Sequence, residues 1–289
     1  MRLCARCAKP LDHASWKCAF CSYEPPRLNG HPAFAIDLAE ENEGFEADYF
    51  ERLARLEANN FWFRSRSRLI FWALKHYFPE AKNFFEVGCG SGFVLSGIRK
   101  AFPDVTASGS EVFRAGLVFA AERLAGVELF QMDARRIPFV EEFDVIGAFD
   151  VLEHIREDEE ALSQMYQATR KGGGLLLTVP HHPFLWSRVD SFARHVRRYR
   201  TSELREKVER AGFSVVRLTS FVTLLLPPLI LSRFKQKLDH QEFDPSSEFV
   251  IGSLMNKALE TILQAEQIVI RAGLSLPAGG SLLLVARRS

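Results

Sequence analysis

Short apolar runs alternate with stretches of helical periodicity along most of the chain. Seven runs have the length of strands, at residues 83–87, 105–110, 127–132, 143–149, 173–179, 213–218 and 281–288. Between them apolar residues recur every three or four positions, for example over 112–125, 157–170 and 201–211. Strands that alternate with helices form parallel sheets through βαβ units. The pattern predicts an α/β domain whose sheet is covered by helices.

Two shorter regions precede this domain. Residues 36–80 repeat apolar positions at helical spacing until Pro79 stops the pattern. Residues 1–30 have little periodicity, and "EPPRLNGHP" punctuates their end. We therefore expect a small module at 1–30, a helical lead-in at 31–80 and the α/β domain at 81–289.

Two stretches exceed a minimal series of βαβ units, at 180–200 and 219–272, and we expect them to build a substrate cover. The overlapping stretch 217–235 is apolar with charges at both ends, and Pro227 and Pro228 interrupt it. Buried core is the preferred interpretation of this stretch. A substrate cover, a dimer contact and a membrane-surface contact stay open as alternatives.

The composition is that of an ordinary soluble domain, with 289 residues, 47% hydrophobic, 25% charged and a net charge of +1. Such a small net charge gives no overall field that would draw the protein to nucleic acid or to an anionic membrane. The N-terminus lacks an apolar signal segment, and no apolar run is long enough to span a bilayer. We expect a cytoplasmic protein, with peripheral membrane contact as the open alternative.

Four of the five cysteines form two C-x-x-C pairs near the N-terminus, Cys4 with Cys7 and Cys18 with Cys21. This spacing is typical of a four-thiolate zinc site. A module with so small an apolar core needs a bound metal or a similar cross-link to be stably folded. We predict a structural Zn²⁺ ion in a zinc ribbon, with two free redox pairs as the alternative. The module is mildly basic, so a protein partner or RNA could bind it.

The fifth cysteine, Cys89, lies in "EVGCGSG", a glycine loop after the first strand of the domain. Dinucleotide folds and P-loops need other residues here, because Phe93 replaces the third dinucleotide glycine and no Lys-Ser/Thr pair follows. Acids end or follow three consecutive strands, at Glu86, Glu111 and Asp133. Glu111 is placed to accept hydrogen bonds from ribose hydroxyls and Asp133 to meet an adenine amino group. We read Cys89 as a core-facing loop residue.

These motifs, with "FDVIGAFDVLEHI" after them, resemble class I S-adenosylmethionine-dependent methyltransferases. The resemblance covers about residues 60–218 and the last strand. It implies a Rossmann-like seven-stranded sheet with the last strand antiparallel, and S-adenosylmethionine over the strands' carboxyl ends. The residues that it implies for the cofactor are Glu86, Gly88, Gly90, Gly92, Glu111, Asp133, Ala134 and Phe149.

"DVLEHI" is similar to the ubiquinone O-methyltransferase branch, in which such a pattern is associated with a divalent cation. The resemblance places Mg²⁺ at Asp150, Glu153 and His154, whereas the favoured alternative is that Glu153 and His154 cap and pack the following turn. His154 and His195 are the candidate general bases. "HVRRYR" resembles an element of bacterial methyltransferases of sugars and small metabolites, and its arginines would suit an anionic substrate group.

The sequence thus predicts O-methylation of a small, sugar- or lipid-linked acceptor. The arrangement of a zinc module before this domain also resembles ribosomal RNA guanine methyltransferases, so a zinc-ribbon-guided RNA methyltransferase is the first rival. A protein that binds zinc or cofactor without chemistry is the second.

Overall fold

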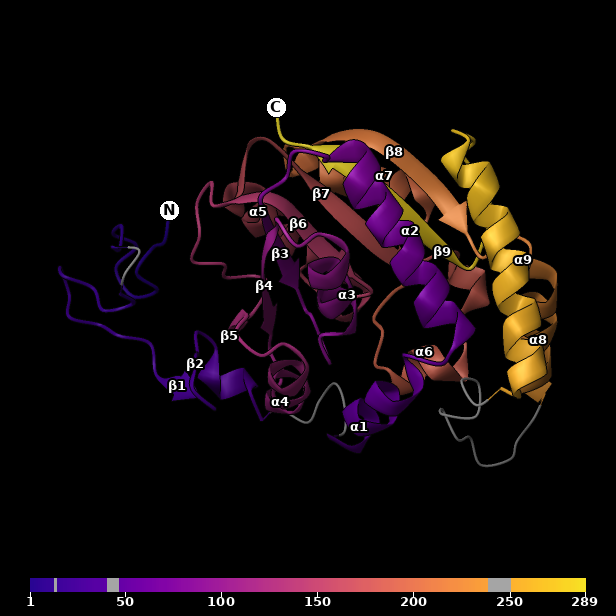
Figure 1. Ribbon diagram of the computed structural model, residues 1–289, viewed down its shortest axis with the longest axis horizontal. Coiled ribbons are helices and arrows are strands. Elements are labelled where there is room, and N and C mark those ends of the chain that lie inside the picture. Colours follow the sequence, from indigo (N-terminus) through magenta and orange to yellow (C-terminus); the bar gives the residue numbers. More distant parts are fainter. Residues whose placement is uncertain (13–14, 41–46, 239–250) are drawn as a thin grey trace.

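The computed structural model describes residues 1–12, 15–40, 47–238 and 251–289, and a seven-stranded sheet lies at its centre (Figure 1). The strands are β3 (Asn83–Val87), β4 (Thr106–Glu111), β5 (Glu128–Gln131), β6 (Phe143–Phe149), β7 (Thr169–Pro180), β8 (Ser214–Phe221) and β9 (Ser281–Arg287). Their order is β5-β4-β3-β6-β7-β9-β8. Only β9 runs antiparallel to its neighbours, β7 and β8. The predicted seven-stranded sheet with an antiparallel last strand is confirmed.

The sheet is covered by helices on both faces. Successive strand residues point to opposite faces, so Phe84 and Phe85 belong to two different apolar cores. The core around Phe85 includes residues of α5 (Asp158–Ala168) and α7 (Thr201–Arg210). The core around Phe84 includes residues of α2 (Phe61–Tyr77), α3 (Phe93–Ala101), α4 (Arg114–Arg123) and α9 (Ser253–Arg271). The carboxyl ends of the parallel strands therefore meet at one edge between these two layers.

The predicted helical lead-in is interrupted. It consists of a 3-10 turn, η1 (Ile36–Leu38), then α1 (Ala47–Leu56) and α2, while residues 41–46 lie outside the described residues. The break before α2 has a local cause, because Asn60 has extended backbone and its side chain accepts a hydrogen bond from the backbone N–H of Trp62 at 2.9 Å. An asparagine cap of this kind starts a new helix.

The N-terminal module lies against the β5 edge of the sheet (Figure 1). Its hairpin of β1 (Arg27–Leu28) and β2 (His31–Pro32) is followed by Ala33, which forms a parallel bridge with Gln131 of β5. Trp16 packs edge-on against Phe130 and Phe139, with ring centroids 5.6 and 5.8 Å apart. The module thus shares its apolar core with the α/β domain.

The first predicted insertion, 180–200, matches the segment between the end of β7 at Pro180 and the start of α7 at Thr201, whereas the second has different bounds from those expected. The first contains η3 (Pro183–Leu185) and α6 (Arg188–Phe192). The second begins later than predicted, because β8 continues to Phe221, and it contains α8 (Leu226–Leu238) and α9. Pro227 and Pro228 lie in the first turn of α8, where proline is tolerated, so they do not break the helix.

Within the apolar stretch 217–235, the last four residues of β8 are buried, as the preferred interpretation expected, whereas Leu231 and Phe234 of α8 are exposed. Residues 239–250 of the second insertion lie outside the described residues. Among the helices that the structure describes, none is both long and apolar enough to cross a membrane.

Candidate active site

The loop between β3 and α3 carries the three predicted glycines, all with positive φ: 67° at Gly88, 54° at Gly90 and 74° at Gly92. A Cβ atom at Gly90 would meet no atom within 4 Å, so the backbone there faces open space. A Cβ atom at Gly92 would lie 2.6 Å from the side chain of Leu124. Gly90 therefore leaves room for a ligand, whereas Gly92 lets α3 approach the end of α4.

A cavity of about 1190 Å³ opens beside this loop, at the carboxyl edge of the sheet. It brings the predicted residues together. Those that line it are Glu86, Gly88, Gly90, Glu111, Asp133, Ala134 and Phe149, together with His154 and His195. Gly92 is outside this lining. Cys89 also borders the cavity but is only 5% exposed, and burial raises the pKa of its thiol well above the usual value. The core-facing interpretation of Cys89 is confirmed.

Two of the predicted acids are buried at the strand ends. Glu86, at the end of β3, is 2% exposed, and one of its oxygens has no hydrogen-bond partner. Glu111, at the end of β4, accepts hydrogen bonds from the backbone N–H groups of Gly90 at 2.9 Å and Phe113 at 3.0 Å. Burial raises the pKa of both carboxyls. Because a carboxylate oxygen accepts more than one hydrogen bond, Glu111 keeps capacity for a ligand hydroxyl.

The third acid, Asp133, is held by a neighbour. The Nε of Arg135 donates to both carboxylate oxygens of Asp133 at 3.0 Å, and Arg135 also pairs with Glu157 at 2.8 Å. The guanidinium therefore fixes the orientation of Asp133 at the edge of the cavity.

A polar contact between the lead-in and the glycine loop was not predicted. Glu57, between α1 and α2, accepts hydrogen bonds from the Ser91 hydroxyl at 2.8 and 2.7 Å and from Arg123 at 2.9 Å. Glu57 lines the cavity and is 7% exposed. No motif marks this residue in the sequence, because the contact joins segments that are 34 residues apart. The lead-in therefore forms one wall of the cavity.

A carboxylate and two imidazoles meet at the other end of the cavity. Glu153 and His154 lie in η2 (Leu152–His154), directly after β6, and His195 follows α6. Potential ligand atoms of these three side chains all lie within 4.8 Å of one another. Burial, and then the nearby charge of His195, lowers the pKa of His154 to about 3. His154 is therefore neutral at pH 7.

Asp150 does not join this cluster. Its carboxylate forms an ion pair with Arg66 of α2, whose guanidinium also lies 4.6 Å from the ring centroid of Trp62. The predicted Mg²⁺ set of Asp150, Glu153 and His154 is thus not the set that the structure brings together. The "DVLEHI" pattern could not reveal that His195, from a distant insertion, lies beside Glu153 and His154 where Asp150 was expected.

Two of the arginines that were expected to suit an anionic substrate group have partners within the protein. Arg198 donates to both oxygens of Asp190, at 2.8 and 3.0 Å, and Arg197 pairs with Asp158. Burial alone would raise the pKa of Asp190. The hydrogen bond from His195 and the charge of Arg198 nevertheless hold this pKa well below its usual value. Two of the arginines therefore serve internal carboxylates, while Arg194 is exposed at the cavity.

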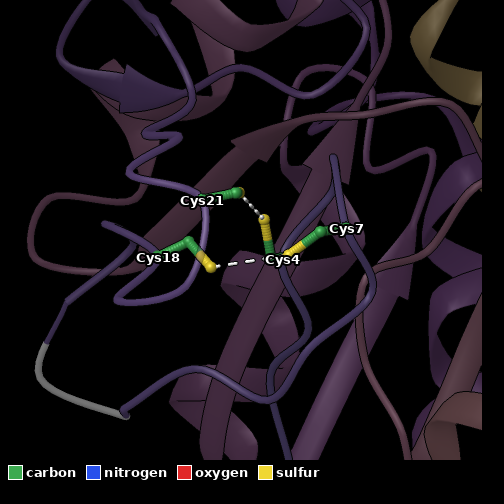
Figure 2. A group of neighbouring side chains, drawn as sticks. All are labelled: Cys4, Cys7, Cys18 and Cys21. Atoms are coloured by element: carbon green, nitrogen blue, oxygen red, sulfur yellow. Dashed lines mark hydrogen bonds between the residues drawn. The ribbon is translucent and has the colours of Figure 1, made fainter.

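Figure 2 shows the four N-terminal cysteines, which converge from two similar turns, with Sγ–Sγ distances of 3.5 Å for Cys4–Cys21 and 3.6 Å for Cys7–Cys18. All four sulfur atoms lie within 4.8 Å of one another. In each turn the N–H four residues after the first cysteine donates to the carbonyl of that cysteine at 2.9 Å. Sulfur atoms bound tetrahedrally at about 2.3 Å from one Zn²⁺ ion have this kind of separation.

The order of the sheet, the glycine loop after β3 and the acids at the ends of β3 and β4 define a class I S-adenosylmethionine-dependent methyltransferase. The chain belongs to the methyltransferase-domain family whose sequence model matches residues 52–218. The region that matches is therefore a methyltransferase domain.

Two proteins of Mycolicibacterium smegmatis are similar in sequence. A probable S-adenosylmethionine-dependent methyltransferase is 27% identical over 165 residues, which are 55% of this chain and 62% of that protein. A fatty-acid O-methyltransferase is 30% identical over 102 residues, 34% of this chain and 37% of that protein. The chain thus matches less than two thirds of the length of either relative.

Solved structures share the fold at low sequence identity. Phosphoethanolamine N-methyltransferase 2 of Haemonchus contortus, bound to S-adenosylmethionine, is 17% identical with a TM-score of 0.57, over 87% of this chain and 59% of that one. A methyltransferase of Haloferax volcanii, in complex with the activator Trm112, is 16% identical with a TM-score of 0.52, over 83% of this chain and 97% of that one. These similarities extend to the fold alone.

Proposed function

We propose that the protein transfers the methyl group of S-adenosylmethionine to an oxygen atom of a small, sugar- or lipid-linked acceptor. One observation carries the proposal: a single cavity is lined both by the predicted cofactor residues and by the Glu153, His154 and His195 cluster. The cavity, at about 1190 Å³, has room for a cofactor and a second molecule.

The cofactor end fits a ligand with a ribose, an adenine and a cationic amino acid part. The open space at Gly90 lets a ligand approach the backbone closely. The carboxyl group of Glu86 is buried and one of its oxygens lacks a hydrogen-bond partner, which suits an ammonium group. Glu111 would accept from the ribose hydroxyls and Asp133 with Ala134 would meet the adenine, beside Phe149. When bound, S-adenosylmethionine supplies a sulfonium methyl group for in-line displacement by the acceptor.

The acceptor end provides a proton acceptor. An acceptor hydroxyl that took the methyl group would have to give up its proton, while the electron pair of the carbon–sulfur bond would stay on sulfur. The hydroxyl proton then passes to the cluster of Glu153, His154 and His195. His195 is the better oriented base, since its Nδ1 lies 2.9 Å from Asp190 and its other nitrogen is left for the substrate side.

Apolar side chains in the lining of the cavity favour an acceptor with an apolar part. They include the side chains of Phe50 and Leu53 from α1, and of Leu225 and Leu229 near α8. The fatty-acid O-methyltransferase relative, which matches a third of the chain, agrees with an apolar acceptor.

We also infer that Cys4, Cys7, Cys18 and Cys21 hold one structural Zn²⁺ ion. Two basic residues of the module have partners within the protein: Arg2 packs over Trp16 at 4.7 Å and pairs with Glu128 at 2.7 Å. Arg27 likewise donates to the carbonyl of Gly30. Protein docking through the ribbon stays a prediction.

The first test is titration calorimetry with S-adenosylhomocysteine, beside NAD as the unrelated nucleotide. We expect binding of S-adenosylhomocysteine only, and its loss in Glu111→Ala. A matched control is Glu128→Ala, since Glu128 is an exposed acid on the adjacent strand β5. Equal loss in both variants would contradict the assignment of Glu111.

The second test is an acceptor screen by mass spectrometry, with hydroxyl and carboxyl compounds that carry apolar tails and the same headgroups without tails. We expect O-methyl products, a lower KM for the tailed compounds, and a lower kcat in His195→Gln with unchanged S-adenosylhomocysteine affinity. Methylation on nitrogen, or cofactor binding with no product from any acceptor, would overturn the proposed function.

A further inference from the structure

The carboxylate of Glu153 and the imidazoles of His154 and His195 form a compact group of ligand atoms. The group is assembled from two segments, η2 after β6 and the loop after α6. The N–H of Val196 donates to the backbone carbonyl of Glu153 at 2.8 Å, which holds the two segments together. The closeness of the three side chains is therefore fixed by the backbone.

Glu153 supplies an independent observation. Its side chain is fully buried, and neither carboxylate oxygen has a hydrogen-bond partner among the described residues. Buried carboxylates without partners are rare, because removal from water costs several kcal/mol. A cation bound at this carboxylate would offset that cost.

Both imidazoles are oriented as metal-bound histidines are. Nδ1 of His195 lies 2.9 Å from an oxygen of Asp190, which is itself held by Arg198 and by the capping hydroxyl of Ser187. His154 has a hydrogen bond to the backbone of Ala193. A carboxylate or carbonyl on one ring nitrogen directs the other nitrogen to a metal.

We infer that Glu153, His154 and His195 form a binding site for a divalent transition-metal ion, with Asp190 as the residue that positions His195. Two imidazoles and one carboxylate suit Zn²⁺, Mn²⁺, Fe²⁺ or Co²⁺. Mg²⁺ and Ca²⁺ prefer ligand sets built from oxygen. Asp150 is not a ligand, because Arg66 pairs with it.

The role of the ion rests on the proposed function. Three protein ligands leave open positions, and an acceptor hydroxyl bound at one of them loses its proton to solvent more readily. In that case His195 acts as a ligand, and ionisation of the acceptor no longer needs a free imidazole.

The test uses the full chain, first loaded with one equivalent of Zn²⁺ for the cysteines and then titrated anaerobically with Co²⁺. We expect one further ion to bind, with d–d absorption bands and without the charge-transfer band of a cobalt thiolate. Glu153→Gln and His195→Gln should abolish this binding, and Asp190→Asn should weaken it by about tenfold or more. Asp150→Asn is the matched control, and its cobalt affinity should equal that of the wild type.

No second ion in the wild type would overturn the inference, and so would an equal loss in Asp150→Asn and His195→Gln. Circular dichroism of each variant excludes misfolding, and His195→Gln carries the test if the buried Glu153→Gln variant does not fold. S-adenosylhomocysteine titrations run in parallel separate the two claims. Loss of cofactor binding contradicts the proposed function, whereas cobalt binding alone decides the metal site.

Discussion

Replacement of Trp16 by alanine tests whether the N-terminal module and the α/β domain fold as one unit. The Trp16 side chain is 8% exposed, and its ring centroid lies 4.9 Å from that of Phe34, 5.6 Å from Phe130 and 5.8 Å from Phe139. Phe130 and Phe139 belong to the main core of the sheet. Truncation would therefore leave a cavity between the module and the sheet.

The expected loss is large. Truncation of a buried tryptophan to alanine costs about 3–5 kcal/mol through lost apolar transfer and the cavity that remains. Because Trp16 lies at the sheet edge, we expect about 3 kcal/mol. This is a substantial share of the roughly 5–15 kcal/mol that stabilises a typical domain.

The measurement is urea unfolding of the zinc-loaded protein, followed by far-ultraviolet circular dichroism. Phe20→Ala is the matched control, since Phe20 belongs to the same module but is 71% exposed, and its loss should stay below about 0.5 kcal/mol. If Trp16→Ala unfolds like this control, the packing argument is wrong. A new early transition with an unchanged main midpoint would show instead that the module unfolds separately.

Three further outcomes are expected. Cys7→Ser should lose the bound zinc equivalent, measured by elemental analysis, while Cys89→Ser should retain it. Burial, followed by the charges of His182 and Arg198, lowers the pKa of His181 to about 4, so the folded state resists protonation of this ring. The free energy of unfolding is unaffected by His181 above pH 6.5 and decreases as the pH falls towards 4, because the unfolded state then binds a proton that the folded state does not. By pH 5 this decrease is about 2 kcal/mol. In His181→Gln the urea midpoint should therefore decrease less between pH 7 and pH 5 than in the wild type. Glu57→Gln should weaken S-adenosylhomocysteine binding by about tenfold in calorimetry, because Ser91 loses its charged acceptor; an unchanged affinity would show that this contact does not shape the glycine loop.

The sheet could be predicted from the sequence because its information is local. Each buried parallel strand is a short apolar run between helices. From this pattern the first and last residues of β3 and β6 were predicted correctly. The strand ends also place Glu86, Glu111 and Asp133 at one edge. The prediction of a shared cavity for these acids follows from sheet geometry alone.

The acceptor end could not be predicted in the same way, because its partners come from distant segments. Arg66 lies in the lead-in and takes Asp150 as its partner, which changes the composition of the polar cluster. His195 reaches Glu153 through the fold of an insertion with no regular period. Side-chain competition of this kind depends on tertiary packing, so spacing along the chain does not reveal it.

The lead-in also turns out to be part of the site, and Gln131 shows how its first residues are attached beside the cavity. Its buried side-chain amide donates to the carbonyls of Ala35 at 2.7 Å and of Val112 at 2.8 Å, and its oxygen accepts from the N–H of Ala35 at 3.0 Å. Val112 lines the cavity directly after Glu111. One amide thus joins the segment that leaves the N-terminal module to the loop that carries the predicted ribose acid.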